Sequence, residues 1–232
     1  MASSSLLARR PMVGGVIAVA VGGMVALGYH YAGARGPGHL DNAIDRRVQQ
    51  RLSGHPRLLL DLVDLANPAT TVLVCAGLCL VFLLLHRWRL GLLVVLGPAI
   101  CTGLVDVVFK PLFDRRLAGG LSYPSGHTAA ASSLAVVVII AMTGPSRPNW
   151  PALYRLFLAL VAVCGAVAVA AALIGGGYHY ATDTIGGLLT AIATVLSIGL
   201  LIDAAAGRRS DEGYVPTHAR RPYAELLPTV KV

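Results

Sequence analysis

Of the 232 residues in the chain, 56% are hydrophobic and only 13% are charged. A soluble domain carries about 25% charged residues, so this composition excludes an ordinary soluble enzyme and indicates a membrane protein. The formal net charge is +8. Because long apolar runs fill the chain, arginines that flank membrane spans explain this charge better than nucleic-acid binding does.

Six apolar runs have the length of about 20 residues that a helix needs to cross a bilayer. They are residues 12–31, 66–86, 90–109, 127–143, 153–174 and 181–203. We therefore expect an all-α protein, a six-transmembrane-helix bundle formed by residues 1–206. Residues 207–232 are polar and contain three prolines, which predicts a flexible cytoplasmic tail.

A short amphipathic interfacial helix is predicted between spans one and two. Leu40, Ile44, Val48 and Leu52 recur at four-residue intervals, with Asp45 and several arginines on the other faces. Asp41 or Asn42 is placed to cap it. The segment serves either as a structural connector or as the border of a lipid entrance.

The basic residues near the span ends predict the orientation. An N-terminus inside the cell places more of them on the cytoplasmic side than outside, which the positive-inside rule favours. Both termini are then cytoplasmic. The Ala-, Gly-, Val- and Arg-rich, lysine-poor composition resembles that of a high-GC bacterium, so we expect a multi-pass protein of a bacterial plasma membrane.

Three polar clusters interrupt the apolar pattern, and the order of the spans places all of them on one side of the membrane. Charged groups at such a boundary are costly unless they have partners or a task. The clusters are Lys110, Arg115 and Arg116 after span three; Ser125, Gly126 and His127 at the start of span four; and His179 with Asp183 at the start of span six.

Together the clusters have the chemistry of phosphoryl transfer. His179 and Asp183 are four residues apart, so on a helix the carboxylate orients the imidazole and leaves its other nitrogen as a nucleophile. Ser125 and Gly126 at a helix start form an anion-binding corner, and His127 is placed to protonate a leaving oxygen. Taken singly, the His179–Asp183 pair and the Pro-Ser-Gly-His segment also fit the capped start of a helix, and a basic loop such as that of Lys110, Arg115 and Arg116 is usually a solvated boundary.

No glycine-rich nucleotide loop and no carboxylate cluster suited to magnesium accompany these clusters. The sequence therefore predicts transfer through a phosphohistidine without a metal or a cofactor.

These clusters resemble the signature of the type 2 phosphatidic acid phosphatase superfamily. That signature reads lysine, six residues, Arg-Pro; then Pro-Ser-Gly-His; then Ser-Arg, five residues, histidine, three residues, aspartate. Residues 124–127 match the middle block, and Lys110, His179 and Asp183 match the others. Two arginine positions depart from it: Leu117-Ala118 replaces Arg-Pro, and Ala172-Leu173 replaces Ser-Arg.

The resemblance implies a membrane lipid phosphatase with its active site at the outer face. His179 would attack phosphorus, Asp183 would stabilise the imidazolium, and His127 would act as acid and base. The phosphoryl oxygens would be held by Lys110, Arg115, Arg116, Ser125 and Gly126.

The substrate class is open within this resemblance. The first expectation is a polyprenyl diphosphate or a polyprenyl-phosphosugar phosphate of cell-envelope synthesis. The alternatives are a phospholipid phosphatase acting on phosphatidic acid or phosphatidylglycerol phosphate, a lipid phosphotransferase, and a non-catalytic protein that binds or transports a lipid phosphate. The sequence does not indicate an oligomeric state.

Overall fold

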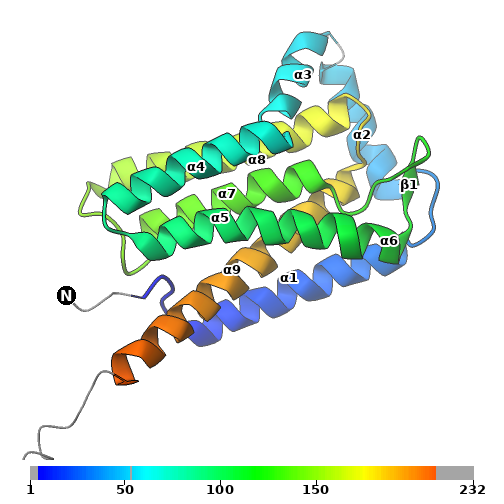
Figure 1. Ribbon diagram of the computed structural model, residues 1–232. Coiled ribbons are helices and arrows are strands. Elements are labelled where there is room, and N and C mark those ends of the chain that lie inside the picture. Colours follow the sequence, from blue (N-terminus) through cyan, green and yellow to red (C-terminus); the bar gives the residue numbers. More distant parts are fainter. Residues whose placement is uncertain (1–4, 53, 213–232) are drawn as a thin grey trace, which may run out of the picture.

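The computed structural model describes residues 5–52 and 54–212, with side chains described up to residue 207. Apart from one two-stranded hairpin, β1 (Arg116–Leu117) with β2 (Gly120–Leu121), the regular elements in this part of the chain are helices. The long helices lie side by side in one bundle (Figure 1).

Five helices are long and apolar enough to cross a membrane by themselves, and a bent pair brings the number to six. The pair is α3 (Pro56–Asp64) with α4 (Pro68–Leu84), bent by 51°. The five are α1 (Arg10–His30), α5 (Trp88–Gly103) continued by η1 (Leu104–Phe109) and α6 (Lys110–Phe113), α7 (Gly126–Thr143), α8 (Ala152–Gly175), and α9 (Ala181–Glu212). The predicted all-α membrane bundle is confirmed. Helix α9 continues past residue 206 to Glu212, and the rest of the predicted tail lies outside the described residues.

The predicted amphipathic helix is α2 (His39–Leu52). Ile44, Val48 and Leu52 of its apolar stripe are half-buried, but its buried side chains are two carboxylates. Leu40 of the apolar stripe is 46% exposed, whereas Asp41 and Asp45 are buried. The expectation that Asp45 covers a solvent side is therefore wrong. The reason is tertiary: both carboxylates accept hydrogen bonds from the start of α9, at the amides of Ala181 and Thr182.

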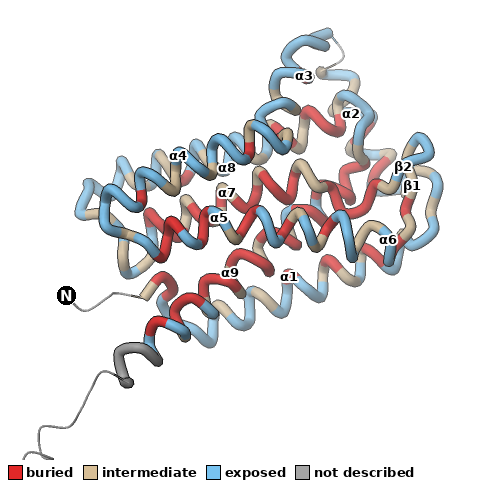
Figure 2. The backbone as a smooth tube through the Cα atoms, viewed as in Figure 1, coloured by how far each residue is buried: buried red, intermediate tan, exposed pale blue. Residues whose placement is uncertain are grey.

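Helices α7 and α9 pack closely in the middle of the bundle, where Figure 2 shows buried residues along both. Gly187 permits this approach, because a Cβ added there would lie 2.5 Å from the backbone oxygen of Ser125. Ser125 in turn donates its amide to the backbone oxygen of Asp183 at 3.0 Å. These contacts hold the N-terminal ends of α7 and α9 together, at the end of the bundle where α2 lies.

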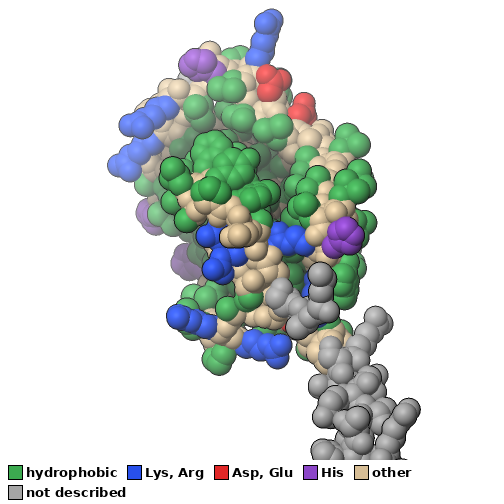
Figure 3. Space-filling model, turned by 90° about the vertical axis from the view of Figure 1, so that its left-hand side faces the viewer, with side chains coloured by type: hydrophobic (Ala, Val, Ile, Leu, Met, Phe, Trp, Pro, Cys, Tyr) green, Lys and Arg blue, Asp and Glu red, His purple; other side chains and the backbone are tan. Residues whose placement is uncertain are grey.

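At the opposite end of the bundle, arginine side chains lie on the surface (Figure 3). Arg147 is exposed in the α7–α8 connection, and Arg87 is half-buried between α4 and α5. The chain start folds back here: Leu6 is buried, and its amide and that of Leu7 donate to the Asp203 carboxylate at 2.8–3.0 Å.

Candidate active site

His179 and Asp183 come together where α9 begins. The imidazole Nδ1 lies 3.5 Å from Oδ2 of the fully buried Asp183 carboxylate. His179 precedes α9 instead of sharing its surface, because the chain turns at Gly177 (φ +71°) before the helix starts at Ala181. Asp183 also accepts the Tyr180 amide at 3.1 Å, as a capping carboxylate does in the first turn of a helix. The four-residue spacing therefore brings His179 to Asp183 across the cap of α9, and the two side chains do not share a face of one helix.

The Pro-Ser-Gly-His segment forms the start of α7. The hydroxyl oxygen of Ser125 accepts from the amide and the hydroxyl of Thr128, at 3.3 and 3.1 Å, and so caps the helix. Ser125 is fully buried, whereas Gly126 and His127 line a cavity. The segment adjoins the start of α9, because the amide of Ser125 donates to the backbone oxygen of Asp183 at 3.0 Å. The two predicted catalytic histidines thus share one site.

The cavity has a volume of about 560 Å³ and lies between α4, α5, η1 and α7. Most of its wall is apolar, and its polar groups gather near the start of α7. The lining residues are Ala66, Pro68, Thr71, Val72, Cys75, Ala76, Val95, Pro98, Ala99, Thr102, Asp106, Lys110, Gly126, His127 and Ala130. From Val95 to Lys110 the wall follows the helix axis for roughly 20 Å at about 1.5 Å per residue. This shape suits an extended apolar chain with an anionic head.

Lys110, at the polar end of the cavity, directly follows η1, which is a π-helix. Wider turns of this kind are frequent at functional sites, since they alter the direction of the side chains that follow. The ammonium of Lys110 lies 2.7 Å from the carboxylate of Asp106, which also lines the cavity. A Cβ placed on Gly126 would lie 3.9 Å from that ammonium. Lys110 and the helix start therefore face the same space.

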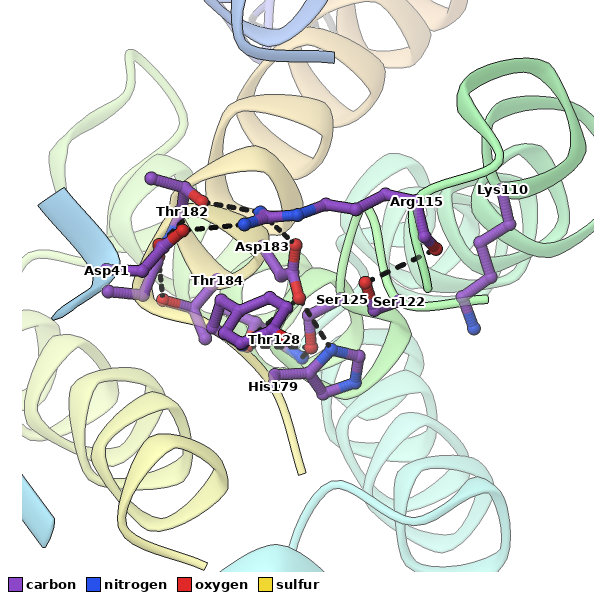
Figure 4. A network of polar contacts seen from close by, with 12 residues as sticks. Asp41, Lys110, Arg115, Ser122, Ser125, Thr128, His179, Thr182, Asp183 and Thr184 are labelled. Atoms are coloured by element: carbon purple, nitrogen blue, oxygen red, sulfur yellow. Dashed lines mark hydrogen bonds and ion pairs between the residues drawn. The ribbon is translucent and has the colours of Figure 1, made fainter. Parts of the chain in front are cut away.

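The structure does not bring the two predicted arginines to this cavity. Arg115 is fully buried behind Asp183, and its guanidinium donates to Asp183, Asp41 and Thr182 at 2.6–2.7 Å (Figure 4). Arg116, in β1, pairs with Asp114 at 2.8 Å and is absent from the cavity wall. The expectation that Arg115 and Arg116 hold the phosphoryl oxygens does not fit this geometry. Arg115 is kept out of the cavity because it pairs with two buried carboxylates.

Sequence reasoning missed the acidic partners of these cations. Asp41 and Asp45 are four residues apart on α2, a spacing that places them on one face, but nothing in the sequence connects that face to α9. Asp106 precedes Lys110 by four residues, an ordinary ion-pair spacing that gives no sign of a π-helix. The first omission concerns contacts that depend on how helices are placed, whereas the second is a local pair whose π-helical setting the spacing does not show.

The two α2 carboxylates have opposite pKa shifts. Burial acts to raise the pKa of Asp41, but hydrogen bonds from the Thr182 and Gly38 amides, the Thr182 hydroxyl and Arg115 outweigh it, so the pKa is lowered. Burial raises the pKa of Asp45 to about 6, opposed by the hydrogen bond from the amide of Ala181. Asp41 therefore stays ionised to a lower pH than an ordinary aspartate, whereas Asp45 takes up a proton more readily than one.

Fold and site together define a multi-pass membrane protein with a histidine–aspartate pair beside an apolar cavity. The sequence profile of the PAP2 superfamily matches residues 109–205, which carry all three polar clusters. Over these residues the chain is similar to that superfamily.

Comparison with solved structures supports the same fold. The chain is similar to the crystal structure of a transmembrane PAP2-type phosphatidylglycerolphosphate phosphatase from Bacillus subtilis, with a TM-score of 0.59 and 17% sequence identity. The match covers 83% of this chain and 96% of that one. No curated protein sequence matches the chain significantly.

Proposed function

We propose that this protein is a membrane lipid phosphatase that works through a phosphohistidine on His179. The observation that carries the proposal is the cavity: an apolar channel ends at Lys110, Gly126 and His127, beside the His179–Asp183 pair. A lipid phosphate has the matching chemistry, with a hydrocarbon chain for the apolar wall and an anionic head for the cation and the helix start.

The proposed reaction has two displacements at phosphorus. In the first, the imidazole nitrogen of His179 that faces away from Asp183 bonds to phosphorus, while the bond to the lipid oxygen breaks and His127 donates a proton to that oxygen. Asp183 stabilises the positive charge on the phosphorylated imidazole. In the second, His127 removes a proton from water, whose oxygen displaces the imidazole and releases inorganic phosphate.

Lys110 and the amides at the start of α7 are the proposed phosphate ligands. Lys110 is a point charge on the cavity wall, and Gly126 lets the phosphoryl oxygens approach the backbone. The buried hydroxyl of Ser125 caps the helix and supports the corner, with its proton still available to donate.

The test is phosphate release by purified protein from lipid phosphates in detergent micelles with EDTA present. His179→Ala is expected to abolish release, because it removes the proposed nucleophile. His127→Ala is expected to reduce it by about 10²–10⁴-fold, the usual contribution of a positioned acid or base. Release that requires an added metal would contradict the metal-independent scheme, and equal release by His179→Ala and wild type would refute the nucleophile.

We propose a polyprenyl diphosphate or a polyprenyl-phosphosugar phosphate as the preferred substrate, because the composition of the sequence resembles that of a high-GC bacterium. A phospholipid is the second candidate, because the similar solved structure is a phosphatidylglycerolphosphate phosphatase. Comparing kcat/KM for both polyprenyl classes, phosphatidic acid and phosphatidylglycerol phosphate separates them. Adding alcohol or sugar acceptors distinguishes a phosphotransferase, and tight binding without turnover identifies a binding protein.

We propose that the site faces the outside of a bacterial plasma membrane, with the N-terminus in the cytoplasm. The exposed Arg147 and the half-buried Arg87 at the opposite end support this orientation. Thiol labelling of intact cells tests it, with single cysteines introduced at Arg147 and at Gly36 in the α1–α2 connection. Labelling of Gly36→Cys alone is expected, and labelling of Arg147→Cys alone would reverse the orientation.

A further inference from the structure

Arg115 occupies a closed polar compartment behind the reactive pair. One terminal nitrogen donates to Oδ1 of Asp183 at 2.7 Å and to the Thr182 hydroxyl at 2.6 Å, and the other donates to Oδ2 of Asp41 at 2.6 Å. The side chain has no exposed surface. To bind a phosphate in the cavity, it would have to leave two buried carboxylates without their cation, which is strongly unfavourable.

Two aromatic rings fix the plane of the guanidinium. Its central carbon lies 4.2 Å from the ring centre of Tyr31, which follows α1, and 4.5 Å from that of Tyr180, which precedes α9. Cation–π contacts at these distances hold the flat group between the rings. The direction in which Arg115 presents its donors is therefore set by parts of the chain far apart in sequence.

Asp41 connects this compartment to α2. Its Oδ1 accepts from the amide and the hydroxyl of Thr182 at 2.9 and 2.7 Å, and its Oδ2 accepts from the Gly38 amide at 2.9 Å in addition to Arg115. The carboxylate is fully buried. It therefore fixes the far side of the guanidinium and joins the start of α2 to the start of α9.

Asp183 divides its two oxygens between this compartment and the catalytic histidine. Oδ1 takes the Arg115 bond, whereas Oδ2 takes the Tyr180 amide and faces Nδ1 of His179 at 3.5 Å. Because a carboxylate is planar, fixing Oδ1 fixes where Oδ2 points. A shift of Arg115 would thus rotate the oxygen that orients the nucleophile.

We infer that Arg115 and Asp41 are positioning residues for Asp183, and that α2 thereby forms part of the working site. The inference rests on the proposed phosphohistidine chemistry. It gives Arg115 a task other than phosphate binding, and it explains why α2 buries its acidic face against α9. Removing either residue should slow the chemical step and leave phosphate binding unchanged.

The experiment uses the full chain in detergent micelles, with wild type and the variants Asp41→Asn, Arg115→Gln and Arg115→Lys. Asp114→Asn is the matched control: it removes the same charge from the neighbouring Asp114–Arg116 pair, and the left-handed backbone at Asp114 (φ +44°) accepts asparagine. The readouts are kcat and KM for lipid phosphate hydrolysis, the Kd for inorganic phosphate by calorimetry, and the thermal unfolding midpoint.

Asp41→Asn and Arg115→Gln are expected to lower kcat by roughly 10–100-fold, the usual effect of removing a group that orients a functional side chain. KM and the phosphate Kd should stay within about threefold, because the lost interaction acts on the chemical step. Arg115→Lys keeps the cation and should recover part of kcat. Asp114→Asn should match wild type in every readout.

Three results would overturn the inference, and one separates it from the proposed function. An Arg115→Gln variant that keeps kcat but binds inorganic phosphate tenfold more weakly would make Arg115 a phosphate ligand. A lower unfolding midpoint with wild-type kcat would make the compartment purely structural, and no recovery in Arg115→Lys would contradict the role of its charge. If wild type itself released no more phosphate than His179→Ala, the proposed function would be refuted. The positioning role of Arg115 and Asp41 would then fail with it.

Discussion

Replacing Gly187 by alanine should separate α7, which carries His127, from the start of α9, beside which His179 and Asp183 lie. The added Cβ would lie 2.5 Å from the backbone oxygen of Ser125 and 3.1 Å from the backbone nitrogen of Ala129. Ordinary contact begins near 3.4 Å, so the start of α7 must move by about 0.9 Å relative to α9. Backbone atoms cannot rotate away as a flexible side chain would.

The expected result follows from what this movement displaces. His127 belongs to the first turn of α7, and His179 and Asp183 are held at the start of α9. A misplacement of about 1 Å costs on the order of 10²-fold in rate. Forcing an extra methyl into a packed interface costs about 1–3 kcal/mol of stability. Gly187→Ala is therefore expected to fold, with kcat reduced about a hundredfold and a lower unfolding midpoint.

The assay is steady-state phosphate release in detergent micelles, beside thermal unfolding of the same preparation. Gly165→Ala on α8 is the matched control, because nothing lies within 4 Å of a Cβ added there. It should retain wild-type activity and gain up to about 1 kcal/mol from helix propensity. Wild-type kcat in Gly187→Ala would show that the α7–α9 approach does not set the distance between the catalytic groups.

Three further substitutions test separate parts of the structure. Burial raises the pKa of Asp45 to about 6, so the folded protein binds more protons there than the unfolded chain, and stability should fall as pH rises from about 4 to 6. Asp45→Asn should flatten this slope in unfolding midpoints measured across pH. An unchanged slope would contradict the assignment to Asp45. Asp106→Asn removes the carboxylate 2.7 Å from the Lys110 ammonium, so KM for a lipid phosphate should fall severalfold, whereas a rise would mean that Asp106 helps to bind substrate. Asp203→Ala leaves the buried amides of residues 6 and 7 without their acceptor. It should lower the free energy of unfolding by about 2–4 kcal/mol, with kcat close to wild type. Denaturation curves equal to those of wild type would show that Asp203 does not stabilise this segment.

The helical layout followed from the sequence because hydrophobic length is a local property. Each predicted span has a counterpart in the structure, and α2 lies where the four-residue repeat indicated. The motif residues at the start of α7 also lie where the sequence placed them, since Ser125 caps that helix through its own local hydrogen bonds. Short-range periodicity and capping chemistry suffice for such features.

The partners of the charged residues did not follow from local patterns. Arg115 was expected at the phosphate, because a cation beside a phosphate motif is the simplest interpretation. Its position instead depends on Asp41, which is 74 residues away in sequence. Nor did the spacing of His179 and Asp183 show that they meet across a helix cap.

The sequence by itself determined that this chain is a membrane bundle with histidines, an aspartate and a lysine at one end, because bilayer thickness and helix geometry convert apolar length directly into spans. Only the tertiary structure decided which of these groups face the cavity and which hold one another. Buried charges are stable only with a counter-charge within a few ångströms, and the chain finds that counter-charge on whichever helix the packing brings close. Here it lies on α2, outside the span motifs, and its pairing with Arg115 leaves Lys110 as the basic residue that the described cavity wall offers.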